Sequence, residues 1–140
     1  MAFTRIKPEG IFAVWGDDEF KKLKKEEQAN SYLIKKDKEL VGEVKSIKPS
    51  KMYGYIFEVQ PDSDTLVIVT GKTQLLNELG FKRIKESDDA WEDGLKATAG
   101  WISTEDVVEE GETVKIIYKG KEKTSRGKPM YVFEALVDRE

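Results

Sequence analysis

The chain has 140 residues, a length that suits one domain, and 36% of them are charged, with a net charge of -3. It contains neither cysteine nor histidine, which excludes disulfides, thiolate or imidazole zinc sites and catalysis by a nucleophile–histidine pair. No apolar run approaches the roughly 20 residues of a membrane-spanning helix, and the N-terminus lacks a signal-peptide core, so we expect a soluble cytoplasmic protein.

The N-terminal part, residues 1–37, is expected to be an extension of the main domain. Residues 11–15 (IFAVW) favour a short strand, residues 17–29 a helix, and residues 31–36 a short extended segment. The helix has few apolar residues, namely Phe20, Leu23 and Ala29. We therefore predict that it packs on the domain as a surface helix.

From residue 40 onward the pattern favours strands. The expected elements are strands over residues 40–47, 52–59 and 65–70, a helix over 72–80 with an apolar stripe of Leu75, Leu76 and Leu79, and strands over 113–120 and 129–137. Gly42 inside the first strand indicates a bulge or a sharp bend. Tyr55 and Phe57 alternate with polar residues, and this period places them in the core.

This order of three strands, a short helix and two further strands is the layout of a five-stranded OB-fold Greek-key barrel. The segments GEVKSI (42–47), YGYIFEV (53–59) and GETVKIIYKGKEKTSRGKPMYVFEALVD (111–138) carry a resemblance to a known family. The chain resembles the small OB-fold single-stranded DNA-binding proteins of phage and archaeal genomes. The resemblance implies a mainly β protein with short helices, an OB-fold domain over residues 38–140, and a role in DNA replication or repair. The chain departs from the family in its N-terminal extension and in an acidic insertion at about 81–108, between the helix and the fourth strand.

In such a barrel the loops joining the first two strands and the last two strands flank one groove. Single-stranded nucleic acid needs cations for its phosphates and flat aromatic surfaces for its bases. The candidate nucleic-acid-binding residues are Lys45, Lys48, Lys51, Lys119, Lys121, Lys123, Arg126 and Lys128 for phosphates, with Tyr53 and Tyr131 for bases. We expect binding that is largely independent of base sequence, to single-stranded DNA or RNA. The alternative for the last loop is a plain hairpin that its charges protect from aggregation.

The acidic residues gather in two clusters, at 86–93 and at 105–112. Solvation of the surface is the commonest role of such clusters. A Ca²⁺ site is disfavoured because the ligand order of an EF-hand loop is missing. A third hypothesis is that the acidic residues mimic phosphates and weaken nonspecific binding. The segment TGKT (70–73) is not a phosphate-binding loop, because Leu66 stands where that motif needs its first glycine.

A second function stays open on the sequence alone. The chain is alternatively a protein-interaction OB module, a replication or virus–host adaptor, whose interface is the acidic segment with Trp91 and Trp101. The expected partners are single-stranded DNA, a second copy of the chain or a replication protein, with no membrane contact. An enzyme is disfavoured, because no convincing group of carboxylates replaces the missing histidine and cysteine. No cofactor or metal ion is expected, and a viral protein of this kind would work in the host cytoplasm.

Overall fold

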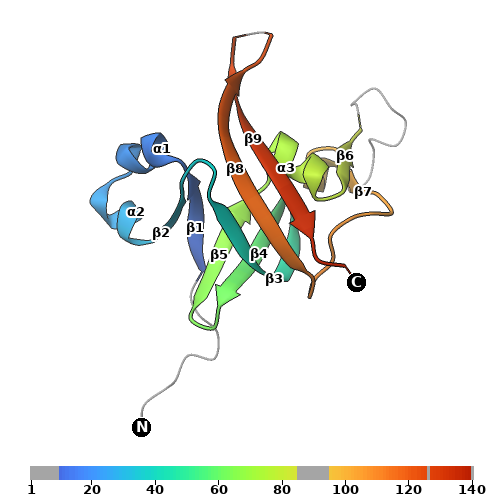
Figure 1. Ribbon diagram of the computed structural model, residues 1–140. Helices are drawn as coiled ribbons and strands as arrows, with labels where there is room; N and C mark the ends of the chain where they lie inside the picture. The colour runs from blue at the N-terminus through green and yellow to red at the C-terminus, as the bar shows by residue number, and fades with distance from the viewer. Residues whose placement is uncertain (1–9, 85–94, 126, 140) are drawn as a thin grey trace.

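The computed structural model describes residues 10–84, 95–125 and 127–139, and it is mainly β, as the sequence predicts. A curled sheet that forms half a barrel makes up its body (Figure 1). In chain order the elements are β1 (Gly10–Trp15), α1 (Asp17–Lys22), α2 (Lys25–Ala29), β2 (Ser31–Ile34), β3 (Glu39–Ser50), β4 (Gly54–Asp62), β5 (Thr65–Thr70), α3 (Thr73–Glu78), β6 (Phe81–Arg83), the 3-10 helix η2 (Leu95–Thr98), β7 (Trp101–Ser103), β8 (Thr113–Lys123) and β9 (Pro129–Val137).

The main sheet has seven strands in the order β2-β1-β5-β4-β3-β8-β9, and β6 and β7 form a separate two-stranded ribbon. β3, β4 and β5 make the predicted antiparallel meander. β3 is shared, because its residues 39–43 pair with β8 and its residues 43–50 pair with β4. The irregularity expected near Gly42 is present as a register shift between Val44 and Ser46. A Cβ at Gly42 would lie 2.6 Å from the backbone of Gln60, so only glycine fits where the strand changes partners.

The N-terminal region contributes more than a surface helix. β1 pairs in parallel with β5 on one side and with β2 on the other, so the sheet has two strands beyond the five expected. The single helix expected over residues 17–29 is two short helices, because Leu23 and Lys24 adopt extended backbone conformations. The carboxylate of Glu27 accepts a hydrogen bond of 3.1 Å from the N–H of Lys24, which caps the start of the second helix.

The hydrophobic core fills the inside of the curled sheet. Trp15 of β1 is only 2% exposed and meets the ring of Phe133 of β9 edge-on, with ring centroids 4.8 Å apart. Phe57 is buried and Tyr55 stacks on a core ring, as the alternation in β4 predicts. The expected leucine stripe of α3 is buried as well, and it consists of Leu75, Leu76 and Leu79. α3 packs against β9, where the Glu78 carboxylate accepts a hydrogen bond from the N–H of Ala135.

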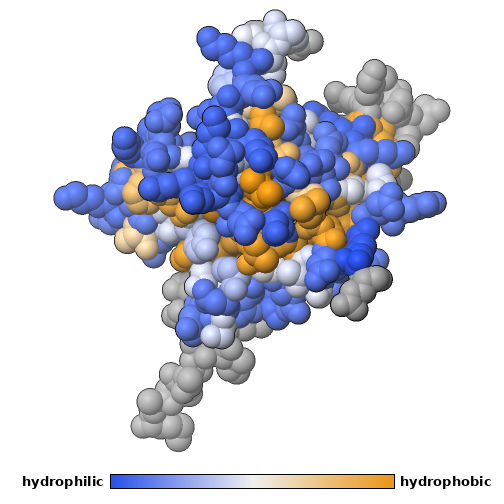
Figure 2. Space-filling model, in the orientation of Figure 1, coloured by the Kyte–Doolittle hydropathy of each residue, from blue (hydrophilic) through white to orange (hydrophobic). Residues whose placement is uncertain are grey.

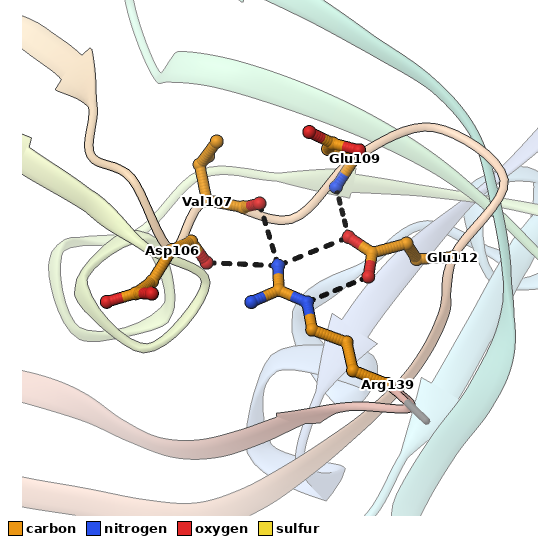
Figure 3. Close-up of polar contacts among 5 residues, drawn as sticks. All are labelled: Asp106, Val107, Glu109, Glu112 and Arg139. Atoms are coloured by element: carbon orange, nitrogen blue, oxygen red, sulfur yellow. Dashed lines mark hydrogen bonds and ion pairs between the residues drawn. The ribbon is translucent and has the colours of Figure 1, made fainter.

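The second acidic cluster is tied to the C-terminal end of the chain (Figure 3). Arg139 donates from Nε to the carboxylate of Glu112 at 2.8 Å, and from Nη2 to the carbonyl oxygens of Asp106 and Val107. Trp101 is buried and holds the β6–β7 ribbon against the body, whereas Trp91 and the first acidic cluster lie outside the described residues. Within the described ranges, no helix has both the length and the apolar character needed to cross a membrane.

Candidate nucleic-acid interface

The β8–β9 hairpin projects beyond the body of the protein (Figure 1), and the visible surface near its tip is mostly hydrophilic (Figure 2). Its turn is closed by backbone hydrogen bonds from Thr124 N–H to the Lys128 carbonyl at 2.9 Å and from Gly127 N–H to the Thr124 carbonyl at 2.8 Å. Lys123 and Lys128 are exposed beside this turn, and Arg126 lies outside the described residues. The backbone thus fixes the hairpin and leaves these two ammonium groups at the surface.

Lys119 and Lys121, which are close in the sequence, lie on opposite faces of this hairpin. A register shift between Tyr118 and Gly120 separates Lys119 from Lys121. The Nζ of Lys119 lies 3.8 Å from the carboxylate of Glu134 on the outer face. The Nζ of Lys121 lies 4.9 Å from the ring centre of Tyr131, its cross-strand partner, on the inner face. Only Lys121 of this pair therefore adds positive charge next to an aromatic ring.

A second lysine, Lys72, reaches the same ring from another part of the chain. Its Nζ lies 4.3 Å from the ring centre of Tyr131, although Lys72 precedes α3 and Tyr131 belongs to β9. Burial lowers the pKa of Lys72 most, the carboxylate of Glu19 opposes this, and the nearby charge of Lys121 lowers the pKa further. Two ammonium groups that repel each other therefore share one partly buried tyrosine ring.

Lys72 also connects the hairpin to the β3–β4 turn. The N–H of Gly71 donates a hydrogen bond of 2.9 Å to the carbonyl of Tyr55. A Cβ at Gly71 would collide with the carbonyl oxygen of Tyr53, so the turn packs directly against the residue that precedes Lys72. From this backbone contact the Lys72 side chain extends to Tyr131. Lys72 and its neighbour Gly71 thus contact the β3–β4 turn on one side and the β8–β9 hairpin on the other.

The β3–β4 turn presents both a cation and apolar side chains. Lys51 is exposed, Met52 is 77% exposed and Tyr53 is 39% exposed. The N–H of Tyr53 donates a hydrogen bond of 3.1 Å to the hydroxyl of Ser50, which closes the turn. Tyr53 is therefore an available aromatic surface, whereas the Tyr131 ring is already in contact with two ammonium groups.

The remaining predicted lysines are partnered by carboxylates. Lys45 forms an ion pair with Glu43, which lies two residues before it on β3. The Nζ of Lys48 lies 3.4 Å from the carboxylate of Glu58, which also accepts a hydrogen bond from the hydroxyl of Ser46. Both lysines are exposed, so they can exchange partners at little cost, but the local net charge of each pair is close to zero. They contribute less to a positive surface than the sequence suggests.

Lys72 is the functional candidate that sequence reasoning missed. It lies in the TGKT segment, which attracted notice only as a false phosphate-binding motif. A usable signal is its position at the junction of the third predicted strand and the helix. In a closed or half-closed barrel, that junction comes to the same end as the last hairpin.

Comparisons of the chain with protein-family models, with curated proteins and with solved structures each found no match. Within the described part of the chain, no group of three or more acidic side chains is arranged to hold a metal ion. The interpretation of the site consequently depends on the contacts around Lys72, Tyr131 and the two loops.

Proposed function

We propose that the chain is a non-enzymatic, OB-type single-stranded nucleic-acid-binding protein, with DNA as its main ligand and little dependence on base sequence. The strand order supports the OB-type assignment. β3, β4, β5 and β8 lie in the spatial order β8-β3-β4-β5, which is the 4-1-2-3 order of a Greek key, and β9 follows next to β8. The shared strand β3 supports it further, because it takes part in both halves of the curl.

The observation that carries the proposal is the contact of Lys72 and Lys121 with Tyr131 between the two loops. The partly buried ammonium group of Lys72 and the exposed one of Lys121, both close to one ring, favour an anion between them, and a phosphate diester supplies that charge. Lys51 lies in the adjacent turn, and Lys123 and Lys128 extend the positive charge along the hairpin. A single strand that follows this line meets cations at successive phosphates.

Within this proposal the two tyrosines have different roles. Tyr53 is exposed at the tip of a turn, which suits stacking on a base. Tyr131 is partly buried and its ring contacts both ammonium groups. We therefore assign it the role of positioning the two lysines. This differs from the sequence-based expectation, in which both tyrosines stack on bases.

Fluorescence anisotropy with a labelled oligo-dT at low and high salt tests the proposal. The wild type should bind at low salt, and its affinity should fall steeply with salt as counterions are released. A Lys121→Ala, Lys123→Ala, Arg126→Ala variant should lose affinity and lower the slope of log K against log salt by about 2, because each lost phosphate contact contributes about 0.7. A charge-matched control with Lys25→Ala, Lys82→Ala and Lys115→Ala should change both quantities much less. A wild type that does not bind at low salt rules the proposal out.

A protein-interaction module is the second candidate function, and an apolar patch supports it. Val41 and Leu136 are 39% and 51% exposed, and they line a shallow hollow of about 290 Å³ on the outer face of β3, β8 and β9. Trp101, in contrast, is buried in the body, which argues against its part in the interface expected from the sequence. Leu136→Glu should leave oligonucleotide affinity unchanged if the patch serves a partner protein and not the nucleic acid.

A further inference from the structure

A cavity of about 270 Å³ lies next to the Lys72–Tyr131 contact and shares Lys121 with it. It is bounded by the start of α1, the β2–β3 turn and the middle of β8. The residues that matter for its chemistry are Gly16, Asp17, Asp18, Lys36, Tyr118 and Lys121. The cavity is therefore continuous with the proposed path of the single strand.

The walls of this cavity carry opposite charges. Asp17 and Asp18 are exposed on the α1 side, and Lys36 and Lys121 are exposed on the side of the β2–β3 turn and β8. A Cβ at Gly16 would lie 3.2 Å from Cε2 of Tyr118, so the backbone passes close to the tyrosine ring and leaves the space above it open. Such a site suits a flat ligand with hydrogen-bond donors at one end and negative charge at the other.

The tyrosine at the base of the cavity provides an independent sign of a ligand. Tyr118 is only 3% exposed, and its hydroxyl makes no hydrogen bond to any residue of the described part of the chain. The hydroxyl oxygen is 3.7 Å from the Cβ position of Gly16, at the cavity wall. Burial raises the pKa of Tyr118, and the charges of Glu19 and Asp18 raise it further, so the hydroxyl stays protonated and can donate. Among the described residues no fully buried side-chain oxygen or nitrogen lacks a partner, so this hydroxyl is open to the cavity, where a bound group can accept its hydrogen bond.

We propose that this cavity binds the base of one nucleotide of the single strand and selects guanine. This inference rests on the proposed function. Guanine has adjacent imino and amino donors on its Watson–Crick edge, which the carboxylates of Asp17 and Asp18 accept, and a carbonyl oxygen that accepts from the Tyr118 hydroxyl. Lys36 and Lys121 face the flanking phosphates. Thymine offers a single imino donor between two carbonyl oxygens, which carboxylates repel, so it fits less well.

The selection concerns one position only. The other contacts along the strand are made by lysines to phosphates and by the exposed ring of Tyr53, and neither kind of contact distinguishes bases. A protein with one selective cavity on a non-selective surface binds any single strand, and its preferred binding register places a guanine in the cavity.

The test compares a labelled oligo-dT with an oligonucleotide of the same length that carries one central dG. Anisotropy titrations give the ratio of the two affinities for each protein variant. The wild type should favour the dG oligonucleotide by about tenfold, a modest value for carboxylates that are exposed to solvent. Asp17→Asn with Asp18→Asn should bring the ratio close to one. The ratio is the informative quantity, because removing negative charge strengthens binding of both oligonucleotides alike.

Two further variants complete the test. Tyr118→Phe removes only the hydroxyl, so it should lower the ratio while leaving the melting temperature unchanged, because that hydroxyl bonds to none of the residues that the structure describes. Asp62→Asn with Asp64→Asn, in the exposed β4–β5 turn, is the charge-matched control and should keep the wild-type ratio. Equal affinity of the wild type for both oligonucleotides, or a ratio that neither cavity variant changes, overturns the inference and leaves the proposed function standing. A wild type that binds neither oligonucleotide overturns both.

Discussion

The Nζ of Lys72 lies 4.3 Å from the ring centre of Tyr131, across a distance of nearly sixty residues in the chain. Lys72 follows the last strand of the β3–β4–β5 meander, and Tyr131 lies near the start of the final strand. In the described residues β5 and β9 are not paired with each other, so this contact and the packing of α3 on β9 link the two halves of the curl. The same contact places two ammonium groups between the β3–β4 turn, which packs on Gly71, and the β8–β9 hairpin.

Lys72→Met should reduce affinity for a single strand without reducing stability. Burial lowers the pKa of Lys72 below its ordinary value of 10.5, so its charged form costs free energy in the folded state. Methionine keeps the apolar stem and removes this cost, although the contact with the ring is lost. We expect the free energy of unfolding near neutral pH to stay unchanged or to rise by up to about 1 kcal/mol, while oligo-dT affinity falls about tenfold.

The stability difference between Lys72→Met and the wild type should also depend on pH, in a direction that the lowered pKa fixes. A lysine whose folded pKa is lowered destabilises the protein below that pKa, and the cost disappears as pH rises toward 10.5. Any stability gain of Lys72→Met should therefore shrink at alkaline pH. Urea unfolding followed by circular dichroism measures the stability, and Lys115→Met on the outer face is the control for the affinity. A large loss of stability in Lys72→Met would show that the lysine serves the fold and not the ligand.

Glu112 should contribute acid-sensitive stability through Arg139. The hydrogen bond from Arg139 is the main cause that lowers the pKa of Glu112 below its ordinary value of 4.5 (Figure 3). A carboxylate with a lowered pKa stabilises the fold above 4.5, and this stability is lost as pH falls through the lowered pKa. The urea midpoint of Glu112→Gln should therefore lie below that of the wild type at neutral pH and approach it in acid.

The control for this prediction is Glu39→Gln, whose carboxylate is 3.9 Å from the Lys115 ammonium group in an exposed pair. Exposed pairs contribute little, so its midpoint should follow the wild type at every pH. A midpoint difference for Glu112→Gln that stays constant from neutral to acid pH would mean that Glu112 acts by packing and not through its charge.

Local patterns predict the elements of this fold better than they predict its connections. The bounds of β5 and β9 agree with the sequence-based expectation, because residues 65–70 and 129–137 alternate or are rich in β-branched side chains between clear turn signals. The same patterns do not show which strands pair. The parallel pairing of β1 with β5 joins segments separated by more than fifty residues, and no local feature of IFAVW specifies its partner.

The residues of the candidate site are likewise predicted from local sequence, whereas their spatial arrangement is not. Sequence composition identifies the basic hairpin and the turn with Tyr53, but it cannot tell that Lys119 and Lys121 lie on opposite faces. That separation depends on the register shift after Tyr118, which a cross-strand pairing creates. The place of Lys72 depends on how far the sheet curls, and this is a property of the whole sheet.

Trp15 provides the sharpest test of whether the N-terminal strands belong to the main domain. It is 2% exposed and packs edge-on against Phe133, while Phe12 on the same strand is 55% exposed. Trp15→Ala should lower the free energy of unfolding by about 3–5 kcal/mol, the usual cost of truncating a fully buried large aromatic side chain. Phe12→Ala removes a similar ring from the same strand and should cost about 0.5 kcal/mol or less.

Urea unfolding monitored by circular dichroism measures both variants of β1. If Trp15→Ala is too unstable to fold, Trp15→Phe keeps part of the contact with Phe133 and should show a smaller loss, which still exceeds that of Phe12→Ala. If residues 10–34 were instead an appendage on an independent barrel, the main transition would be the same in all three variants. Equal midpoints for Trp15→Ala and Phe12→Ala would therefore contradict the shared core, whereas a single shifted transition in Trp15→Ala follows if β1 and β9 stabilise one cooperative unit.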